Sequence, residues 1–202
     1  MRFAKLMVIV SIALPTNAMA QTADFDKTVR NLFFGADIMM TSAFDSLMKL
    51  PDLHHSDEVL CQSSLSTTIK LKADKDALAC RHFFVFTRSP VPNMRIDTGY
   101  IEITMGQAPG IRKILDVNWE LQFDTKEEGM ACFGKLKSMF TAVSTTKKFE
   151  FDKSDKVYIA EFSTRNPAEK GIRDITLMFG RFAHEKKYRM RLIPINEFSK
   201  KQ

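Results

Sequence analysis

The densest cluster of side chains that could do chemistry lies at residues 52–58, with the sequence DLHHSDE. It holds two of the four histidines and three acids. Imidazole and carboxylate groups ligate zinc and similar ions, so His54, His55 and Asp57 are the metal candidates. Together with Glu58 they are also the candidates for a metal-dependent or other hydrolase. Adjacent ligands on an irregular segment match no established metal-site spacing. The sequence therefore favours a polar loop here and predicts no cofactor.

The string Thr-Arg-x-Pro occurs twice, at residues 87–90 and 164–167. Two guanidinium groups at equivalent strand ends could clamp a carboxylate or a phosphate between them. Arg88 and Arg165 are for this reason the candidate binding residues. A repeated turn, in which proline stops a strand and the arginine is solvated, explains the same pattern and is favoured.

Sequence motifs of common enzyme classes are missing. The chain has no G-x-S-x-G, no phosphate-binding G-x-x-x-x-G-K-[ST] and no G-x-G-x-x-G. A catalytic triad assembled in space would leave no such motif. The sequence thus leans against an enzyme and names no catalytic residue.

The cysteines number three: Cys61, Cys80 and Cys132. An exported chain would form one disulfide and keep one thiol. Cys61–Cys80 is favoured because it closes the shorter loop, and Cys80–Cys132 is the alternative if a helix packs on a sheet. The remaining thiol is predicted to be a small buried hydrophobe rather than a nucleophile.

The N-terminus carries the pattern of a secretory signal. A short positive start precedes an apolar run over residues 6–14, and the small-residue triplet AMA follows at residues 18–20. We expect a signal peptide over residues 1–20, cleaved before Gln21, and a periplasmic or secreted location. The apolar run is too short to span a bilayer, so no transmembrane segment is expected after cleavage.

The composition is that of a globular protein, with 202 residues, 45% of them apolar and 27% charged. The net charge is +6 and falls to about +4 without the predicted signal. The basic excess lies from Arg181 onward, and we interpret it as the solvated face of a strand followed by a tail. We expect no nucleic-acid partner, because no aromatic residues are interleaved with these charges.

Hydrophobic periodicity divides the chain into helices and strands. Spacings of three and four residues predict a helix over 23–50, which Gly35 could split. A second helix is expected from residue 124, capped by Asp124 or Thr125. Alternation predicts eight strands, at 64–71, 80–87, 99–105, 114–123, 148–151, 157–163, 172–179 and 188–195.

The order helix, four strands, helix, four strands predicts a tandem α-β4 duplication in an α+β fold. The expected boundaries are 21–123 for the first repeat and 124–202 for the second, with little linker between them. We expect the repeats to join into one antiparallel sheet of about eight strands, with two main helices packed on one face. This order of elements resembles that of the bacterial secreted proteins that inhibit β-lactamases. The resemblance concerns architecture alone, which implies no activity.

The function expected from these features is that of an exported, non-enzymatic protein that binds a protein partner, through a sheet face left partly open. One alternative is a carrier of a small apolar or amphipathic ligand, held between the sheet and helices rich in Phe and Met. The hydrolase is the second alternative. The sequence leaves a monomer and a homodimer open, as it does the identity of any partner.

Overall fold

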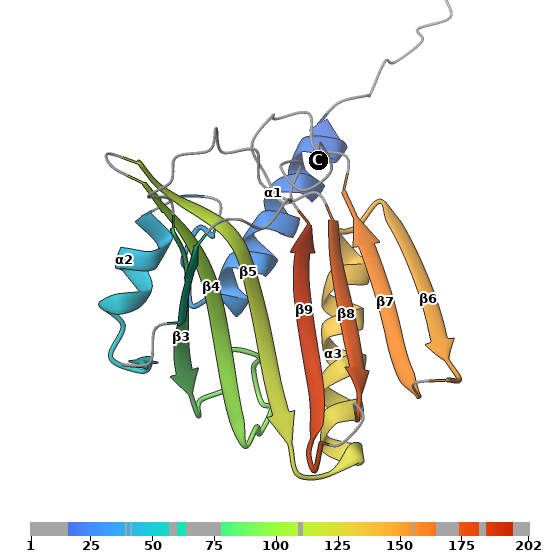
Figure 1. Cartoon of the computed structure of the whole chain (residues 1–202). Coiled ribbons are helices and arrows are strands. Elements are labelled where there is room, and N and C mark those ends of the chain that lie inside the picture. The colour runs from blue at the N-terminus through green and yellow to red at the C-terminus, as the bar shows by residue number, and fades with distance from the viewer. Residues whose placement is uncertain are drawn as a thin grey trace, which may run out of the picture.

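The structure is a computed structural model that describes residues 16–38, 40, 42–56, 60–63, 78–108, 111–154, 156–164, 174–181 and 185–195. Within them lie three helices and one antiparallel sheet (Figure 1). The helices are α1 (Thr16–Leu32), α2 (Ser42–Met48) and α3 (Lys126–Val143). The strands are β1 (His54–His55), β2 (Leu60–Ser63), β3 (Leu78–Phe86), β4 (Thr98–Ala108), β5 (Ile111–Phe123), β6 (Thr146–Asp152), β7 (Val157–Ser163), β8 (Asp174–Gly180) and β9 (Tyr188–Ile195).

The sheet follows the spatial order β1-β3-β4-β5-β9-β8-β7-β6, and β2 also pairs with β3. The two halves of the chain meet where β5 pairs with β9, from Trp119 opposite Leu192 to Phe123 opposite Tyr188. The expected joined sheet is confirmed. In Figure 1, α3 carries the chain from β5 to β6, past the three strands between them. The sheet is open, because its two end strands do not pair with each other.

All three helices contribute to one apolar core on a single face of the sheet (Figure 1). Alternate residues of each long strand point into this core, where Trp119 is fully buried. The rings of Phe25 in α1 and Phe140 in α3 lie 5.7 Å apart between centroids, so the two long helices pack on each other as well. The opposite face of the sheet carries the other half of each strand's side chains.

Helix α3 is capped by Thr125, one of the two residues that the sequence predicted as its cap. The Thr125 hydroxyl accepts a hydrogen bond from the Glu128 backbone N–H at 3.2 Å, and it donates to the Glu128 carboxylate at 2.9 Å. One turn later Gly129 brings the helix against β8, because a β-carbon there would lie 2.2 Å from the ring of Phe179. This glycine sets the distance between the helix and the sheet.

The helix expected over 23–50 is two helices in the structure. After α1 the backbone N–H of Gly35 donates to the carbonyl oxygen of Arg30, and the N–H of Phe34 donates to the carbonyl oxygen of Asn31. Phe34 and Gly35 both have positive φ. This is the Schellman pattern that terminates a helix. The prediction that Gly35 divides the segment is confirmed, and the continuous helix to residue 50 is wrong.

The two halves share the order helix, then strands, and the predicted strand positions agree closely with the observed ones. The strand expected at 64–71 lies outside the described residues. Residues 54–55 and 60–63 are strands where none was predicted. Both strands are short and pair with β3. Segments of two to four residues are too short to show the alternation from which a strand is predicted.

The predicted cleavage point before Gln21 lies within α1. The residues of α1 shown to be buried, Phe25, Val29 and Leu32, all follow that point, so cleavage would leave them in place. Among the described helices, none combines the length and the hydropathy needed to span a membrane.

Candidate functional site

The face of the sheet opposite the helices carries a pocket of about 570 Å³ at the junction of the two halves. Alternation in the strands sends one side chain in two to this face. Trp119 borders the pocket although its side chain points into the core. The other lining residues come from β3, β4, β5 and β9 and are Phe83, Tyr100, Glu102, Asn118, Glu120, Gln122, Arg189, Arg191 and Ile193. The pairing of β5 with β9 therefore builds the pocket from residues far apart in sequence.

Glu120 is the centre of the charged part of the pocket. It lies between Tyr100 on β4 and Arg191 on β9 in the strand register. Its Oε2 accepts from Nε of Arg191 at 2.8 Å, and its Oε1 lies 3.1 Å from Nη1 of Arg189. Gln122 also donates to Oε1, at 3.2 Å. The Glu120 side chain is 16% exposed, so these partners compensate the cost of removing its charge from water.

Both arginines also meet a second carboxylate. Glu185 lies 2.7 Å from Nε of Arg189 and 4.0 Å from Nη2 of Arg191. The result is a network of two carboxylates and two guanidinium groups whose charges balance. Each arginine thus lies near both carboxylates, and Arg191 donates a hydrogen bond to Glu120.

Glu102 lies beside this network on β4, opposite Asn118 on β5. Burial raises the pKa of its carboxyl, Arg81 lowers it, and the neighbouring Asp116 and Glu120 raise it further. The Arg81 Nε lies 3.8 Å away, and that side chain is 49% exposed, which leaves the pairing weak. Glu102 is thus the carboxylate of the pocket whose charge is least compensated.

Apolar groups border the charges. Phe83, Tyr100 and Ile193 line the pocket and are all partly exposed. Paired charges beside aromatic surface offer a place where an apolar group can be buried while polar groups around it hydrogen-bond. The titratable side chains among the described residues that line the pocket are those of Tyr100, Glu102, Glu120, Arg189 and Arg191.

Two of the three metal candidates, His54 and His55, lie in the described part of the chain. His54 and His55 are consecutive residues of strand β1, so their side chains point to opposite faces. Asp57 lies outside the described residues. In the described part of the chain, no group of three or more His, Cys, Asp or Glu side chains could hold a metal ion.

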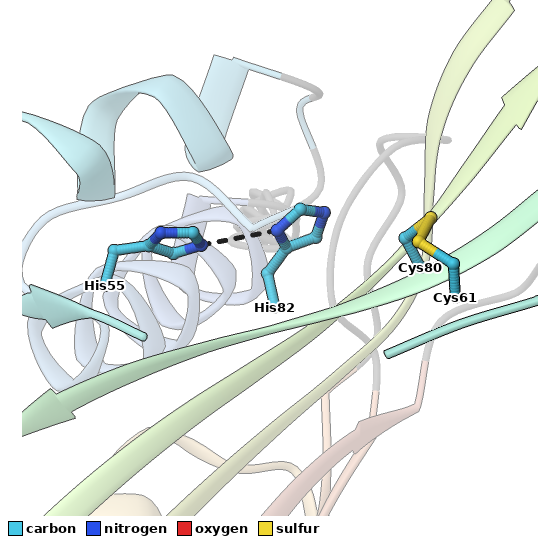
Figure 2. The surroundings of a disulfide bond; sticks show 4 residues. All are labelled: His55, Cys61, Cys80 and His82. Carbon is cyan, nitrogen blue, oxygen red and sulfur yellow. Dashed lines mark hydrogen bonds between the residues drawn. A yellow bond between two sulfur atoms is a disulfide. The ribbon is translucent and has the colours of Figure 1, made fainter. Parts of the chain in front are cut away.

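His55 has instead a partner that the sequence did not identify. Its Nε2 lies 3.3 Å from Nδ1 of His82 on β3, and Figure 2 shows the two rings facing each other. The Phe44 ring of α2 lies 4.7 Å from His82 and 5.9 Å from His55, between centroids. The contacts among His55, His82 and Phe44 therefore connect β1, β3 and α2. The expected polar loop is a strand at this point.

Cys61 and Cys80 form a disulfide (Figure 2). They are directly opposite in the pairing of β2 with β3, and their Cα atoms lie 4.1 Å apart. The alternative pairing of Cys80 with Cys132 is wrong. Cys132 is a free thiol buried in α3, where desolvation raises its pKa to about 12. A thiol that remains protonated is a poor nucleophile, in agreement with a structural role.

Arg88 lies just after β3, with a side chain 79% exposed and 3.2 Å from Asp52. Arg165 lies outside the described residues, so a clamp made by the two arginines stays a prediction. The strands before them, β3 and β7, have four strands between them and run in opposite directions. The ends of β3 and β7 that precede these arginines therefore lie at opposite ends of the sheet.

The fold and the pocket define the chain as an α+β protein with one covered and one open sheet face. No family model matches it, and neither a curated protein nor a solved structure matches it significantly. The pocket is thus the basis for a functional argument.

None of the pocket residues is among the binding or metal candidates that the sequence predicts. Arg189 and Arg191 belong to the basic excess near the C-terminus, for which the sequence favours a solvated strand face. The signal that could have found them was the alternation itself, because it separates the core residues of each strand from a second, partly polar set.

Proposed function

We propose that this protein is an exported, non-enzymatic binding protein, and that it engages a protein partner through the open face of its sheet. The observation that carries the proposal is the pocket around Glu120, where two arginines paired with this carboxylate lie beside aromatic surface. Tyr, Phe and Arg are among the residue types enriched at the centres of protein interfaces. We expect the partner to insert an apolar side chain over Tyr100 and to surround it with hydrogen-bonding groups.

The disulfide supports the location. Cys61 and Cys80 are bonded, and such bonds persist in oxidising compartments outside the cytosol. Export to the periplasm or the medium is thus the location that agrees with both the bond and the signal-like N-terminus.

The test is site-specific photo-crosslinking in the cells that export the protein. A photoreactive amino acid would replace Phe83 in the pocket or, as a matched control, Ile159. Both are partly buried residues of the open face, but Ile159 lies on β7, away from the pocket. We expect one discrete protein adduct at position 83 and none at 159. Equal labelling at both positions, or none at either, would refute the proposal.

The captured protein would then be purified and its affinity measured directly. Tyr100→Ala should weaken binding about tenfold or more, as expected for an aromatic residue at an interface centre. Thr176→Ala, on β8 of the same sheet, should leave the affinity unchanged. Native mass spectrometry of the gently purified protein separates this function from the alternatives, because a bound lipid or metal ion would appear as added mass.

A further inference from the structure

Strand β6 ends the sheet, and this end is unusually exposed. It pairs with β7 on one side, and in the described part of the chain no strand pairs with its other side. Six of its seven residues are exposed. Unpaired N–H and C=O groups along such an edge are a template for another strand.

The two faces of β6 differ in chemistry. Phe149 and Phe151 lie on the helix side, 45% and 47% exposed, although both are large apolar residues. The Phe149 ring lies 5.8 Å from that of Phe162, so it continues the edge of the core into solvent. Lys148 and Glu150 alternate with them on the open face, where they form an ion pair.

We propose that β6 pairs with β6 of a second copy of this chain, antiparallel and about a two-fold axis through Phe149. In this register Phe149 lies opposite the partner's Phe149, which covers the exposed rings. Lys148 lies opposite the partner's Glu150, and by symmetry Glu150 lies opposite the partner's Lys148. Opposite charges directly across an antiparallel pair stabilise it, and like charges destabilise it.

The sequence of β6 selects this register over its neighbours. An axis through Lys148 would place two lysines directly opposite each other, and an axis through Glu150 would oppose two glutamates. An axis through Phe149 also places Lys147 opposite the partner's Phe151. A lysine over an aromatic ring already occurs on this surface, where Lys137 Nζ lies 3.8 Å from the centre of the Phe149 ring.

The dimer is independent of the proposed partner site. β7 and β8 lie between β6 and β9, the nearest strand that lines the pocket. Pairing through β6 would extend the sheet across both copies and leave both pockets open.

Charge exchange tests the pairing. Sedimentation velocity over a concentration series should show the purified wild-type protein passing from monomer to dimer. Lys148→Glu and Glu150→Lys should each raise the dissociation constant of the dimer at least tenfold. Each substitution places like charges directly opposite each other at both symmetry-related positions. Both side chains are well exposed, at 60% and 47%, so neither variant should alter folding. An equimolar mixture of the two variants should restore the dimer, because opposite charges then face each other again.

A cysteine scan tests the register. Phe149→Cys places two thiols opposite each other at the axis, where cross-strand β-carbons lie about 4.5–5.5 Å apart. Mild oxidation should therefore link most of this variant into covalent dimers. Phe151→Cys is the matched control, since that residue is equally exposed but faces Lys147, and it should link poorly. A wild-type protein that stays monomeric, a dimer indifferent to both charge variants, or equal cross-linking of the two cysteine variants would each overturn the proposal.

Discussion

Helix α3 has two glycines in different surroundings, which makes its packing on the sheet measurable. Gly129 is buried against β8, whereas at Gly134 no atom outside the adjacent residues and the nearby helix backbone lies within 4 Å of the position where its β-carbon would be. Alanine is favoured over glycine in a helix interior by about 1 kcal/mol. The helical preference is thus the same at both positions, and only the contact with the sheet differs.

The expected cost at Gly129 follows from the position of one ring. A β-carbon would lie 2.2 Å from Cε2 and 2.5 Å from Cζ of Phe179. Since carbon atoms in contact lie about 3.5–4.0 Å apart, the ring or the helix must move by more than about 1 Å. The Phe179 ring is 1% exposed and packs against the rings of Phe123, Phe133 and Tyr158, so its movement would disturb these contacts. Overpacking of this kind costs about 1–3 kcal/mol.

We therefore expect Gly134→Ala to stabilise the protein by about 1 kcal/mol. Gly129→Ala should be less stable than Gly134→Ala by about 1–3 kcal/mol, because the helical preference cancels in the difference. Urea denaturation followed by circular dichroism measures both, with equal slopes confirming that the unfolding transition itself is unchanged. If Gly129→Ala stabilises the protein as much as Gly134→Ala, then α3 does not pack on β8 as described.

Three further predictions concern the cysteines and the pocket. Replacing both Cys61 and Cys80 by serine should lower the free energy of unfolding by about 3 kcal/mol in urea titrations, because the bond closes a loop with a sequence separation of 19. A loss below measurement error would show that the bond does not constrain the unfolded chain. Cys132 should resist iodoacetamide at pH 8 in the native protein and react fully in denaturant, since burial raises its pKa to about 12; rapid native labelling would contradict this. Glu102→Gln should stabilise the protein at pH 8, because burial raises the pKa of Glu102 above its ordinary value of 4.5 and its ionised form therefore costs stability. The gain in stability should shrink as the pH falls through the raised pKa of Glu102 and vanish below its ordinary pKa. Thermal melts at pH 4 and pH 8 measure this, and an equal gain at both pH values would refute the prediction.

Much of the fold could be predicted because the local signals agree with the final structure. Alternation located β7 and β9 at their observed bounds, and the acidic start with Thr125 located the beginning of α3. The predictions that were wrong or missing concern segments whose structure depends on a neighbour. β1 and β2 are too short to show a period, and they are strands only because β3 offers them an edge.

The candidate site could not be predicted in the same way. Glu120 and Arg191 are 71 residues apart in sequence, and their contact requires that β5 and β9 pair in one particular register. A shift by one residue would send these side chains to the covered face. The same reasoning applies to His55 and His82, which the sequence treated as unrelated.

By itself the sequence determined the types and order of most elements, the α+β class and the favoured disulfide, because each of these depends on spacing along the chain. Only the tertiary structure decided which strands meet, which face stays open, where Glu120 finds its arginines and which strand ends the sheet. Such long-range pairings arise when distant segments bury apolar surface together, and a single sequence records the patterns of those segments but not their partners.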